Sequence, residues 1–378
     1  MTMLEILTQA DWGGREEVVV SLSHALSALG HQVTVACPPD TPMCRRAQAL
    51  GLPVWPIRLA GKRFGLRDLR ALKQLLTEVG TDVTHWHDRA TYAAVLHGSR
   101  AFRRQAMICT VHAVRSLNRR RRLVLRRLPR PLVAVSGAVH DSLVANGVPP
   151  EGVTVISNGV DVPSLCSRAL PREQARQGLG LSPDGLVIGG VGRFSPEKGF
   201  RDFVLAARII AHRDPGVQLV LVGDGPERPE LERLAAESGL SDRLRFAGYR
   251  DDAARLLCAL DVLLFPSVCD EACPMVPIQA GALGVPVVAT RSGGAPEIVG
   301  DGRTGIVVEK GAPEQMADAA LRLLCDEPLR RQMASAAAAR VREQFDIATT
   351  ARRYVELAEL VLAAQRPARV PAEVEPCR

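Results

Sequence analysis

The segment GGVGRFSPEKGF (residues 189–200) carries two basic side chains on a glycine-bearing loop between an apolar strand and a predicted helix with Ser195 as its N-cap. Backbone N–H groups at the start of a helix are unpaired and attract anions. Arg193 and Lys198 add positive charge, and a guanidinium can bind a phosphate through two parallel hydrogen bonds. The loop therefore predicts a diphosphate site; the alternative is a surface loop with solvated charges. A nicotinamide fingerprint does not fit, because Ser195 stands where G-x-G-x-x-G needs its third glycine.

A second polar pair follows an apolar strand in PSVCDEACPMVPIQAGALG (residues 266–284). Glu271 falls in the predicted loop, and Gln279 follows eight residues later, at the predicted start of a helix of small residues. A carboxylate and an amide at a strand end can hydrogen-bond the hydroxyl groups of a sugar or a ribose. The alternative for an isolated acidic residue here is capping of the helix.

Histidines form the third group of candidates. His85 and His87 have a metal-like spacing on a strand, but the sequence offers no third ligand for them. We therefore predict no metal site and interpret both as packing and loop contacts. His112 follows the next apolar strand, in TVHA, where an isolated histidine is usually a structural hydrogen-bonding residue.

Strands and helices alternate along both halves of the chain, which predicts parallel sheets. The first half opens with an apolar strand at residues 4–7, a glycine-bearing loop and a helix that Gly30 ends. A second series runs from about residue 186 to residue 309. The predicted fold is α/β, with two Rossmann-like parallel-sheet domains facing each other across a cleft. Ligands are expected at the carboxyl edges of the sheets.

The polar, irregular segment from Asp161 to about Pro183 separates the two series. The expected units are a domain in residues 1–170, a domain in residues 171–345, a helix in residues 346–365 that packs back toward the first domain, and a flexible tail in residues 366–378.

Composition limits the class of protein. Of the 378 residues, 47% are hydrophobic and 24% are charged, which excludes disordered, collagenous and coiled-coil chains. Nine scattered cysteines without CxxC spacing argue against a disulfide framework, so we expect a cytoplasmic protein. No run approaches the roughly 18 apolar residues of a membrane span, and Glu5 interrupts the first apolar run, which argues against a secretory signal.

The net charge of +7 comes from the first half, where residues 1–165 hold 21 Lys and Arg against 12 Asp and Glu. The stretch LNRRRRLVLRRLPR has leucines between its arginines at helical spacing. It can form a basic amphipathic surface for a membrane with anionic headgroups. The alternatives are a solvated loop and nucleic-acid binding, which an aromatic content of 4% argues against. The arginines at its centre are Arg119, Arg120, Arg121 and Arg122.

These motifs, with VLVGDGP, DVLLFPS, GVPVVAT and SGGAPEIVGDGRTGIVV, resemble the C-terminal half of retaining glycosyltransferase family 4 (glycosyl transferases group 1), which has the GT-B fold. GGREEVVVSLSHALSALGHQVTV, DVTHWHD, TVHA and VISNGVD are similar to its N-terminal half. The resemblance covers nearly the whole chain. It implies an acceptor-binding N-terminal domain and a C-terminal domain that binds a nucleotide sugar.

The resemblance also implies roles for single residues of the C-terminal half. Arg193 and Lys198 would hold the nucleotide diphosphate and stabilise the leaving charge without a metal or cofactor. Glu271 would contact the hydroxyl groups of the donor sugar. Gln279 stands where the family has the glutamate that holds the ribose, so the chain departs from the pattern there. Tyr249 lies where the family places base contacts, and Met275 would bear on sugar selectivity.

In the N-terminal half, Gly13 and Gly14 match the loop that approaches the phosphates or the acceptor, where a missing side chain permits close contact. His112 matches a family histidine near the donor sugar.

The expected function is retaining transfer of a sugar from a UDP- or GDP-sugar to a glycan or lipid-linked acceptor, in lipopolysaccharide or other envelope polysaccharide biosynthesis. A front-face displacement fits the family, because no carboxylate pair of a retaining hydrolase is evident. The expected location is the cytoplasm, with a peripheral place on the inner face of the membrane. The alternatives are a GT-B epimerase or phosphorylase, and a non-catalytic scaffold that uses the arginine-rich stretch.

Overall fold

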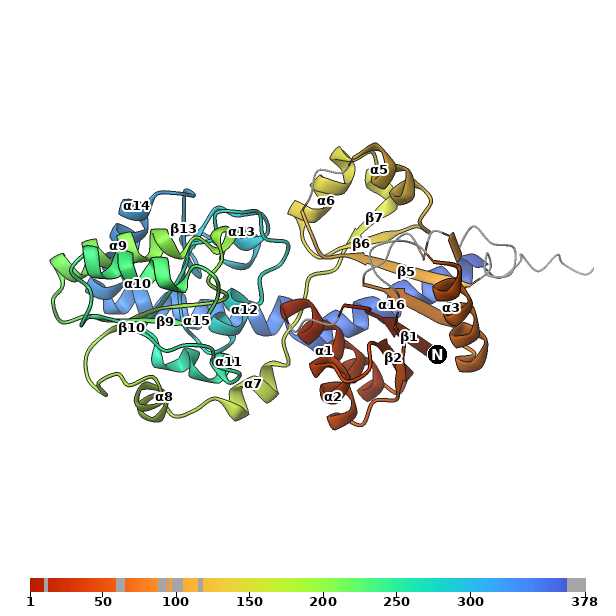
Figure 1. Cartoon of the computed structure of the whole chain (residues 1–378), viewed down its shortest axis with the longest axis horizontal. Coiled ribbons are helices and arrows are strands. Elements are labelled where there is room, and N and C mark those ends of the chain that lie inside the picture. The colour runs from red at the N-terminus through yellow and green to blue at the C-terminus, as the bar shows by residue number, and fades with distance from the viewer. Residues whose placement is uncertain are drawn as a thin grey trace, which may run out of the picture.

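The structure is a computed structural model of the chain, and its elements fall into two halves that lie side by side (Figure 1). It describes residues 1–9, 13–58, 65–87, 93, 95–96, 105–114 and 118–365. Each half contains one parallel sheet with helices on both faces, which confirms the predicted α/β class with two Rossmann-like sheets.

Seven strands build the sheet of the N-terminal half, in the order β3-β2-β1-β4-β5-β6-β7. Their bounds are β1 (Thr2–Ile6), β2 (Gln32–Cys37), β3 (Val54–Pro56), β4 (Val83–Trp86), β5 (Ala106–Val111), β6 (Leu132–Ala134) and β7 (Val153–Val155). The central strands β1, β4 and β5 are buried on both faces. Most of their residues are apolar, as burial of both faces requires.

Helices flank this sheet, and α1 shows how the sequence forms them. Val18, Leu22 and Leu26 recur at helical spacing and are buried, while the start of α1 follows Gly13. The helices of this half are α1 (Gly14–Ala28), α2 (Pro42–Ala49), α3 (Leu66–Val79), α5 (Arg119–Arg126) and α6 (Gly137–Ala145), and a 3-10 turn spans Pro150–Gly152. No helix in the described part of the chain has the length and apolar character that a bilayer span requires.

Two short helices, α7 (Val162–Arg168) and α8 (Arg172–Gly178), connect the halves within the segment that the sequence predicted to be irregular. Asp161 and Pro163 explain the first of them. The carboxylate of Asp161 accepts a hydrogen bond from the backbone of Ser164, and proline is well suited to the first turn of a helix.

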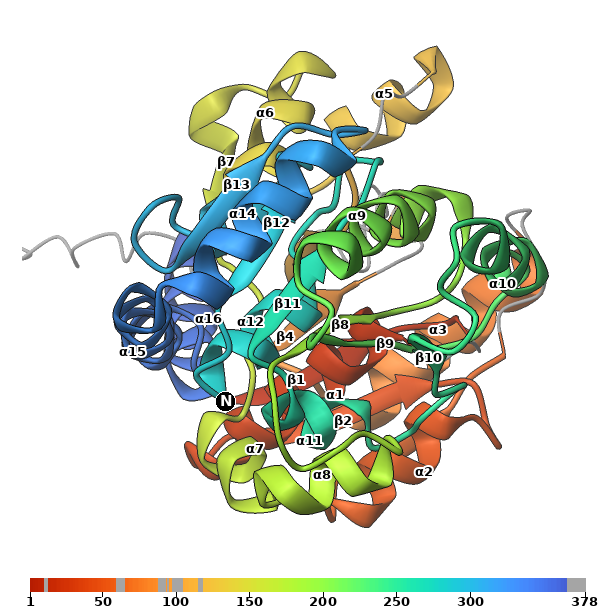
Figure 2. The ribbon, with the colours of Figure 1, turned by 90° about the vertical axis from the view of Figure 1, so that its left-hand side faces the viewer.

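Six strands build the second sheet, in the order β10-β9-β8-β11-β12-β13. Their bounds are β8 (Val187–Val191), β9 (Gln218–Val222), β10 (Leu244–Phe246), β11 (Val262–Phe265), β12 (Val287–Thr290) and β13 (Gly305–Val308). Figure 2 looks onto this half, with α9 and α14 on one side of the strands and α11 on the other. Its helices are α9 (Phe200–Arg213), α10 (Arg228–Glu237), α11 (Ala253–Leu256), α12 (Met275–Ala282), α13 (Ala295–Ile298), α14 (Pro313–Cys325) and α15 (Glu327–Gln344), with 3-10 turns at Pro196–Lys198 and Leu257–Ala259.

Two helix starts differ from the sequence prediction. The helix predicted to begin after Ser195 is a single 3-10 turn, and α9 begins only at Phe200, because Gly199 adopts a left-handed conformation between them. Gln279 lies in the middle of α12 rather than at its start. That helix begins at Met275 because Pro277 falls in its first turn, where a proline is tolerated.

The last helix, α16 (Ile347–Gln365), leaves the second half and lies against α1 and β5 of the first (Figure 1). Its buried face packs into the apolar cluster around Met3, Leu22 and Ile108. The residues of α16 in that cluster are Ile347, Ala351, Tyr354, Leu357, Ala358 and Val361. The tail predicted in residues 366–378 lies outside the described residues.

Candidate active site

The loop that follows β8 (residues 192–199) packs against the loop that follows β11. The carbonyl of Glu197 accepts a hydrogen bond from the backbone N–H of Val268 at 3.1 Å and lies 3.0 Å from Ser267 Oγ. Gly199 lies where the two backbones approach most closely. Its φ is +67°, and a Cβ there would lie 2.1 Å from the carbonyl oxygen of Pro266. A side chain would force the loops apart, so this position requires glycine.

Packing of these loops brings Lys198 and Glu271 together, although they are 73 residues apart in the sequence. Lys198 Nζ lies 2.7 Å from Glu271 Oε1, and Ser267 Oγ donates a hydrogen bond to the same oxygen at 2.7 Å. The side chains retain 30% and 16% exposure, so both groups remain accessible from solvent. Lys198 and Glu271, which the sequence placed in separate groups, thus lie together at the carboxyl edge of the second sheet.

Arg193 is exposed on the loop that carries Lys198. Between them, Ser195 Oγ donates a hydrogen bond to Glu197 Oε1 at 2.7 Å. That hydrogen bond lowers the pKa of Glu197, and the positive charges of Lys198 and Arg193 act in the same direction. The loop therefore presents two cations and a carboxylate that stays ionised at neutral pH.

Polar side chains of three strands meet at the carboxyl edge of the first sheet. His87 Nε2 lies 2.7 Å from Glu5 Oε2, and His87 Nδ1 lies 3.1 Å from His112 Nε2. On the other side of Glu5, His85 Nδ1 lies 2.9 Å from Oε2, though not in hydrogen-bonding geometry. Glu5, His85 and His87 are buried, whereas His112 is partly exposed. The histidines interpreted as packing and loop contacts are therefore part of a polar cluster that reaches His112.

The role of Glu5 in this cluster was not predicted from the sequence. Burial alone would raise the pKa of Glu5, but the charge of His85 and the hydrogen bond from His87 bring that pKa down to about 2. A glutamate inside an apolar first strand was the available signal. Its partners follow from strand order, because β1 pairs with β4 in a register that places Glu5 opposite His85.

Glu5, His85 and His87 could in principle hold a metal ion, since their ligand atoms lie within 4.8 Å of one another. Tetrahedral zinc ligands lie 2.0–2.1 Å from the ion and hence about 3.3 Å from each other. The separation of 2.7 Å between His87 Nε2 and Glu5 Oε2 is too short for such a pair and matches a hydrogen bond. The contact is better explained by a hydrogen bond than by a metal.

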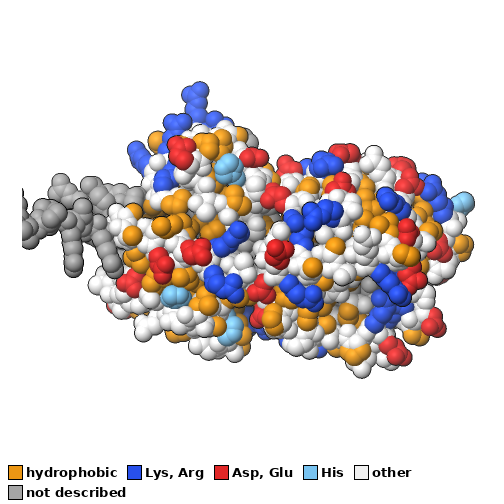
Figure 3. Space-filling model, turned by 180° about the vertical axis from the view of Figure 1, so that it is seen from behind, with side chains coloured by type: hydrophobic (Ala, Val, Ile, Leu, Met, Phe, Trp, Pro, Cys, Tyr) orange, Lys and Arg blue, Asp and Glu red, His pale blue; other side chains and the backbone are white. Residues whose placement is uncertain are grey.

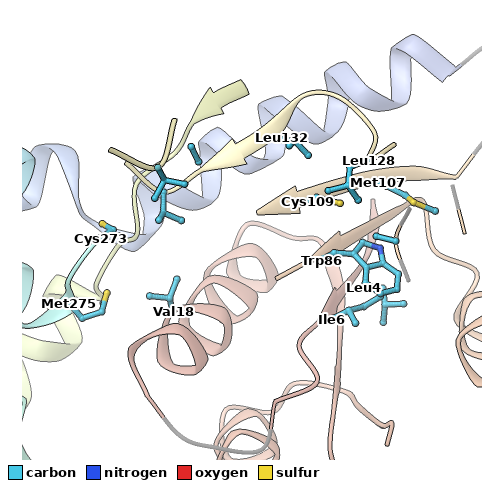
Figure 4. Close-up of a cluster of buried hydrophobic side chains, with 14 of the residues drawn as sticks. Leu4, Ile6, Val18, Trp86, Met107, Cys109, Leu128, Leu132, Cys273 and Met275 are labelled. Carbon is cyan, nitrogen blue, oxygen red and sulfur yellow. The ribbon is translucent and has the colours of Figure 1, made fainter. Parts of the chain in front are cut away.

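Several contacts join the two halves beside these clusters. A Cβ on Gly14, the first residue of α1, would lie 3.1 Å from Met275 Cγ, and Figure 4 shows Met275 facing Val18 of the same helix. Gln279 Nε2 donates a hydrogen bond to Glu17 Oε1 at 3.2 Å. The structure thus brings Gly14, Met275 and Gln279 of the predicted site together at one contact. Gly13 lies directly before α1, and the preceding residues 10–12 lie outside the described part of the chain.

Further contacts between the halves involve backbone groups. Glu297 accepts hydrogen bonds from the N–H groups of Gly137 and Ala138 at the start of α6, each at 2.9 Å. Asn158 Nδ2 donates to the carbonyl of Cys273 at 3.1 Å. These contacts hold the carboxyl edges of the two sheets next to each other.

Tyr249 lies apart from this group. It follows β10, the edge strand of the second sheet, and it is 70% exposed. Among the described residues, no hydrogen bond or ring contact ties it to Lys198 or Glu271, so its predicted contact with a base stays a prediction.

A hollow of about 820 Å³ lies elsewhere, lined by residues such as Val217, Gln218 and Leu244. These residues are at the amino ends of β9 and β10. Parallel α/β sheets bind ligands at their carboxyl ends, so this hollow is not the expected site despite its size.

Comparison with protein families gives two matches that follow each other along the chain. Residues 12–163 match the model described as "Glycosyltransferase Family 4", and residues 171–340 match "Glycosyl transferases group 1". The chain belongs to the family 4, group 1 glycosyltransferases. The family suggested by the sequence motifs is therefore confirmed.

Curated relatives of this family 4 member match it over part of its length. A lipopolysaccharide core biosynthesis glycosyltransferase of Rhizobium meliloti is 40% identical over 136 residues, 36% of this chain and 38% of the relative. A D-inositol 3-phosphate glycosyltransferase of Actinosynnema mirum is 34% identical over 230 residues, 52% of this chain and 54% of the relative. This chain thus spans about two fifths to half of the length of these two relatives.

Solved structures establish the GT-B fold of this family 4 member. A glycosyltransferase from Rickettsia africae has a TM-score of 0.85 at 20% identity, covering 96% of this chain and 98% of its own. Anabaena HepE in complex with UDP and glucose has a TM-score of 0.81 at 23% identity, covering 95% of this chain and all of its own. At these identities the likeness shows the fold alone.

The arginine-rich stretch forms α5, which projects from the N-terminal half of this family 4 member (Figure 3). Leu125 and Leu128 are buried, and Leu123 is 52% exposed. Arg119 and Arg122 are exposed, whereas the side chains of Arg120 and Arg121 lie outside the described part. The predicted membrane surface stays a prediction.

Proposed function

We propose that the protein is a retaining glycosyltransferase that moves a sugar from a nucleotide-diphosphate sugar to a glycan or lipid-linked acceptor. Family membership supports the reaction class. The curated relative from Rhizobium meliloti is named for lipopolysaccharide core biosynthesis, and one structural neighbour, WaaG, for lipopolysaccharide biosynthesis. We propose the same setting here, the biosynthesis of lipopolysaccharide or another envelope polysaccharide.

The pairing of Lys198 with Glu271 at 2.7 Å is the observation that supports this function most directly. A cation and a carboxylate at one edge of a parallel sheet can serve the two parts of a nucleotide sugar. The ammonium of Lys198 and the guanidinium of Arg193 bind the diphosphate, and Glu271 accepts hydrogen bonds from sugar hydroxyls. Since a diphosphate competes with Glu271 for Lys198, donor binding releases the carboxylate toward the sugar.

Bond breakage at the sugar carbon places negative charge on the departing diphosphate. Arg193 and Lys198 stabilise that charge in the transition state, which is electrostatic catalysis by fixed cations. The departing phosphate then accepts the proton of the acceptor hydroxyl on the same face, which retains the configuration. We propose that no metal is needed, because the two cations supply the required charge.

Calorimetric titration with UDP, GDP and ADP tests the donor site, with Anabaena HepE, solved with UDP-glucose, as the precedent for UDP. We expect saturable binding of one nucleotide, unchanged by a chelator. The double variant Arg193→Ala, Lys198→Ala should lose that binding, whereas Arg213→Ala, an exposed cation on α9, should retain it. Absence of binding by all three nucleotides would contradict the proposal.

We propose that α5 rests on an anionic membrane surface while the acceptor enters the site. The exposed Arg119 and Arg122 and the exposed Leu123 support it. Replacement of Arg119 to Arg122 by serine should abolish sedimentation with vesicles that contain phosphatidylglycerol and leave nucleotide binding intact. Equal sedimentation of variant and parent would refute the membrane role.

A further inference from the structure

Hydrogen bonds connect the buried carboxylate of Glu5 to His112 through one intervening ring, that of His87. The two links are His87 Nε2 to Glu5 Oε2 at 2.7 Å and His87 Nδ1 to His112 Nε2 at 3.1 Å. An ionised carboxylate has no proton to donate. The proton in the first link therefore belongs to His87 Nε2.

Burial then decides the protonation of the other ring nitrogen of His87. Burial lowers the pKa of His87 to about 4, and the charges of His85 and Arg15 act in the same direction, against Glu5. At neutral pH His87 therefore carries a single proton, on Nε2, and its Nδ1 is an acceptor. The proton in the second link must come from His112 Nε2.

The same reasoning shows that Nδ1 of His112 carries no proton. Burial lowers the pKa of His112 well below its usual value, with His87, Arg15 and His85 adding to the effect, so the ring is neutral and its Nδ1 carries no proton. His112 is partly exposed at the edge of the sheet, and no other hydrogen bond to it is found among the described residues.

We propose that Glu5 and His87 are positioning residues that hold His112 in the Nε2–H tautomer, so that its Nδ1 accepts a hydrogen bond from a hydroxyl group of the donor sugar. This inference rests on the proposed function for the identity of the ligand. The tautomer itself depends only on the two hydrogen bonds that link Glu5 to His87 and His87 to His112.

A second branch starts at His85, whose Nδ1 lies 2.9 Å from Glu5 Oε2 on the opposite side of the carboxylate. His85 Nε2 lies 2.7 Å from Thr110 Oγ1, which in turn lies 3.0 Å from the hydroxyl of Tyr354 on α16. Since β1, β4, β5 and α16 all contribute, the group that orients His112 is fixed by tertiary packing rather than by a loop.

The tautomer is measured directly by long-range proton–nitrogen correlation of the imidazole rings in the full chain labelled at its eight histidines. We expect neutral Nε2–H signals for both His87 and His112 at pH 7.5, assigned with His87→Asn and His112→Asn. In Glu5→Gln the amide can donate as well as accept, so Nδ1–H signals should appear for both rings. An Nδ1–H tautomer of His112 in the parent protein, or an unchanged spectrum in Glu5→Gln, would overturn the proposal.

A functional series separates positioning from packing. His87→Asn keeps an acceptor near the place of Nδ1, whereas His87→Leu fills the space without one. If His87 positions His112, kcat should fall about tenfold more in His87→Leu than in His87→Asn, measured with UDP-glucose or with the diphosphate glucose of whichever nucleotide binds. Binding of the free nucleotide should be unchanged in both variants. Equal loss in both variants would indicate a packing role and contradict the inference.

Thr84→Val is the matched control. Thr84 is buried on β4, next to His85, but its hydroxyl contacts the carbonyl of Ala106 and takes no part in the hydrogen bonds that link Glu5, His87 and His112. It should lower stability without changing the His112 tautomer. If the parent protein binds none of the nucleotides but shows the expected tautomer, the proposed function is refuted, while the hydrogen-bond arrangement of Glu5, His87 and His112 still stands. One equivalent of tightly bound zinc in the purified protein, found by elemental analysis, would overturn the proposed hydrogen bonds between Glu5, His87 and His112.

Discussion

Gln279 on α12 donates a hydrogen bond to Glu17 on α1 at 3.2 Å, and this contact joins the two halves at the predicted ribose position. Burial raises the pKa of Glu17, against the effects of Arg46, Arg168 and the Gln279 hydrogen bond. The amide of Gln279 thus faces a carboxylate that a second carboxylate would repel. Glu17 is thus a structural reason why residue 279 is a glutamine here, where the family has a glutamate.

Gln279→Glu should destabilise this contact by about 1 to 3 kcal/mol, because it places two carboxylates together in a partly buried position. Guanidinium unfolding at pH 8 measures the loss. The double variant Glu17→Gln, Gln279→Glu restores an amide facing a carboxylate and should recover most of the stability. Equal stability of Gln279→Glu and the parent protein at pH 8 would contradict the contact.

Lys198→Ala and Glu271→Gln should act in opposite directions on nucleotide binding. Loss of the ammonium weakens diphosphate binding by about tenfold or more, since a charge-assisted contact is lost. Loss of the carboxylate frees Lys198 from its partner at 2.7 Å, so the diphosphate binds as well as before or more tightly while sugar transfer falls. Calorimetry with the free nucleotide, followed by a transfer assay, distinguishes the two. Weaker nucleotide binding in Glu271→Gln would argue against competition for Lys198.

Glu297→Ala should cost about 1 to 2 kcal/mol, because the first N–H groups of α6 lose the carboxylate that accepts from them at 2.9 Å. Small-angle X-ray scattering should also report a larger mean size, since this contact joins the two halves. Glu343→Ala, on the exposed side of α15, is the control and should change neither quantity. An unaltered unfolding midpoint in Glu297→Ala would show that the contact adds no stability.

Gly199→Ala should destabilise the protein far more than Gly302→Ala. Both glycines have positive φ, +67° and +71°, but a Cβ at residue 199 meets the carbonyl of Pro266 at 2.1 Å and one at residue 302 meets nothing within 4 Å. We expect about 1 kcal/mol for Gly302→Ala from backbone strain alone and several kcal/mol for Gly199→Ala. Thermal unfolding compares them, and similar midpoints would contradict the close packing of the two loops.

Acid should destabilise the folded state below about pH 6.5. His87 has a pKa of about 4 when folded and 6.5 as its ordinary value, so the unfolded chain takes up a proton first as the pH falls. The free energy of unfolding then drops by about 1.4 kcal/mol per pH unit for this group until about pH 4. Glu5, with a pKa of about 2 against 4.5, adds a further loss below pH 4.5.

Urea unfolding at pH 7.5, 6.0 and 5.0 measures this dependence. His87→Asn removes one of the two buried titrating rings and should reduce the slope between pH 6.5 and 4.5, while the contribution of His112 remains. A slope equal to that of the parent protein would show that His87 is not buried in its neutral form.

The sequence by itself determined the α/β class, the two sheets and the placement of Arg193, Lys198 and Glu271 in loops at the edge of the second sheet. Apolar strands and amphipathic helices follow from local periodicity, and Arg193, Lys198 and Glu271 stand in loops directly after apolar strands. In parallel sheets all strands end at the same edge, so these loops share that edge, and the adjacency of β8 and β11 in the sheet brings them into contact. The family motifs gave the same arrangement independently.

Only the tertiary structure decided which residues face each other across strands and between the halves. Glu5 and His87 are 82 residues apart, and Gln279 and Glu17 are 262 apart. Strand order and register bring the first pair together, and docking of α12 against α1 brings the second. Neither is encoded in local periodicity, because the periodicity fixes which face of an element is buried and not which element covers it.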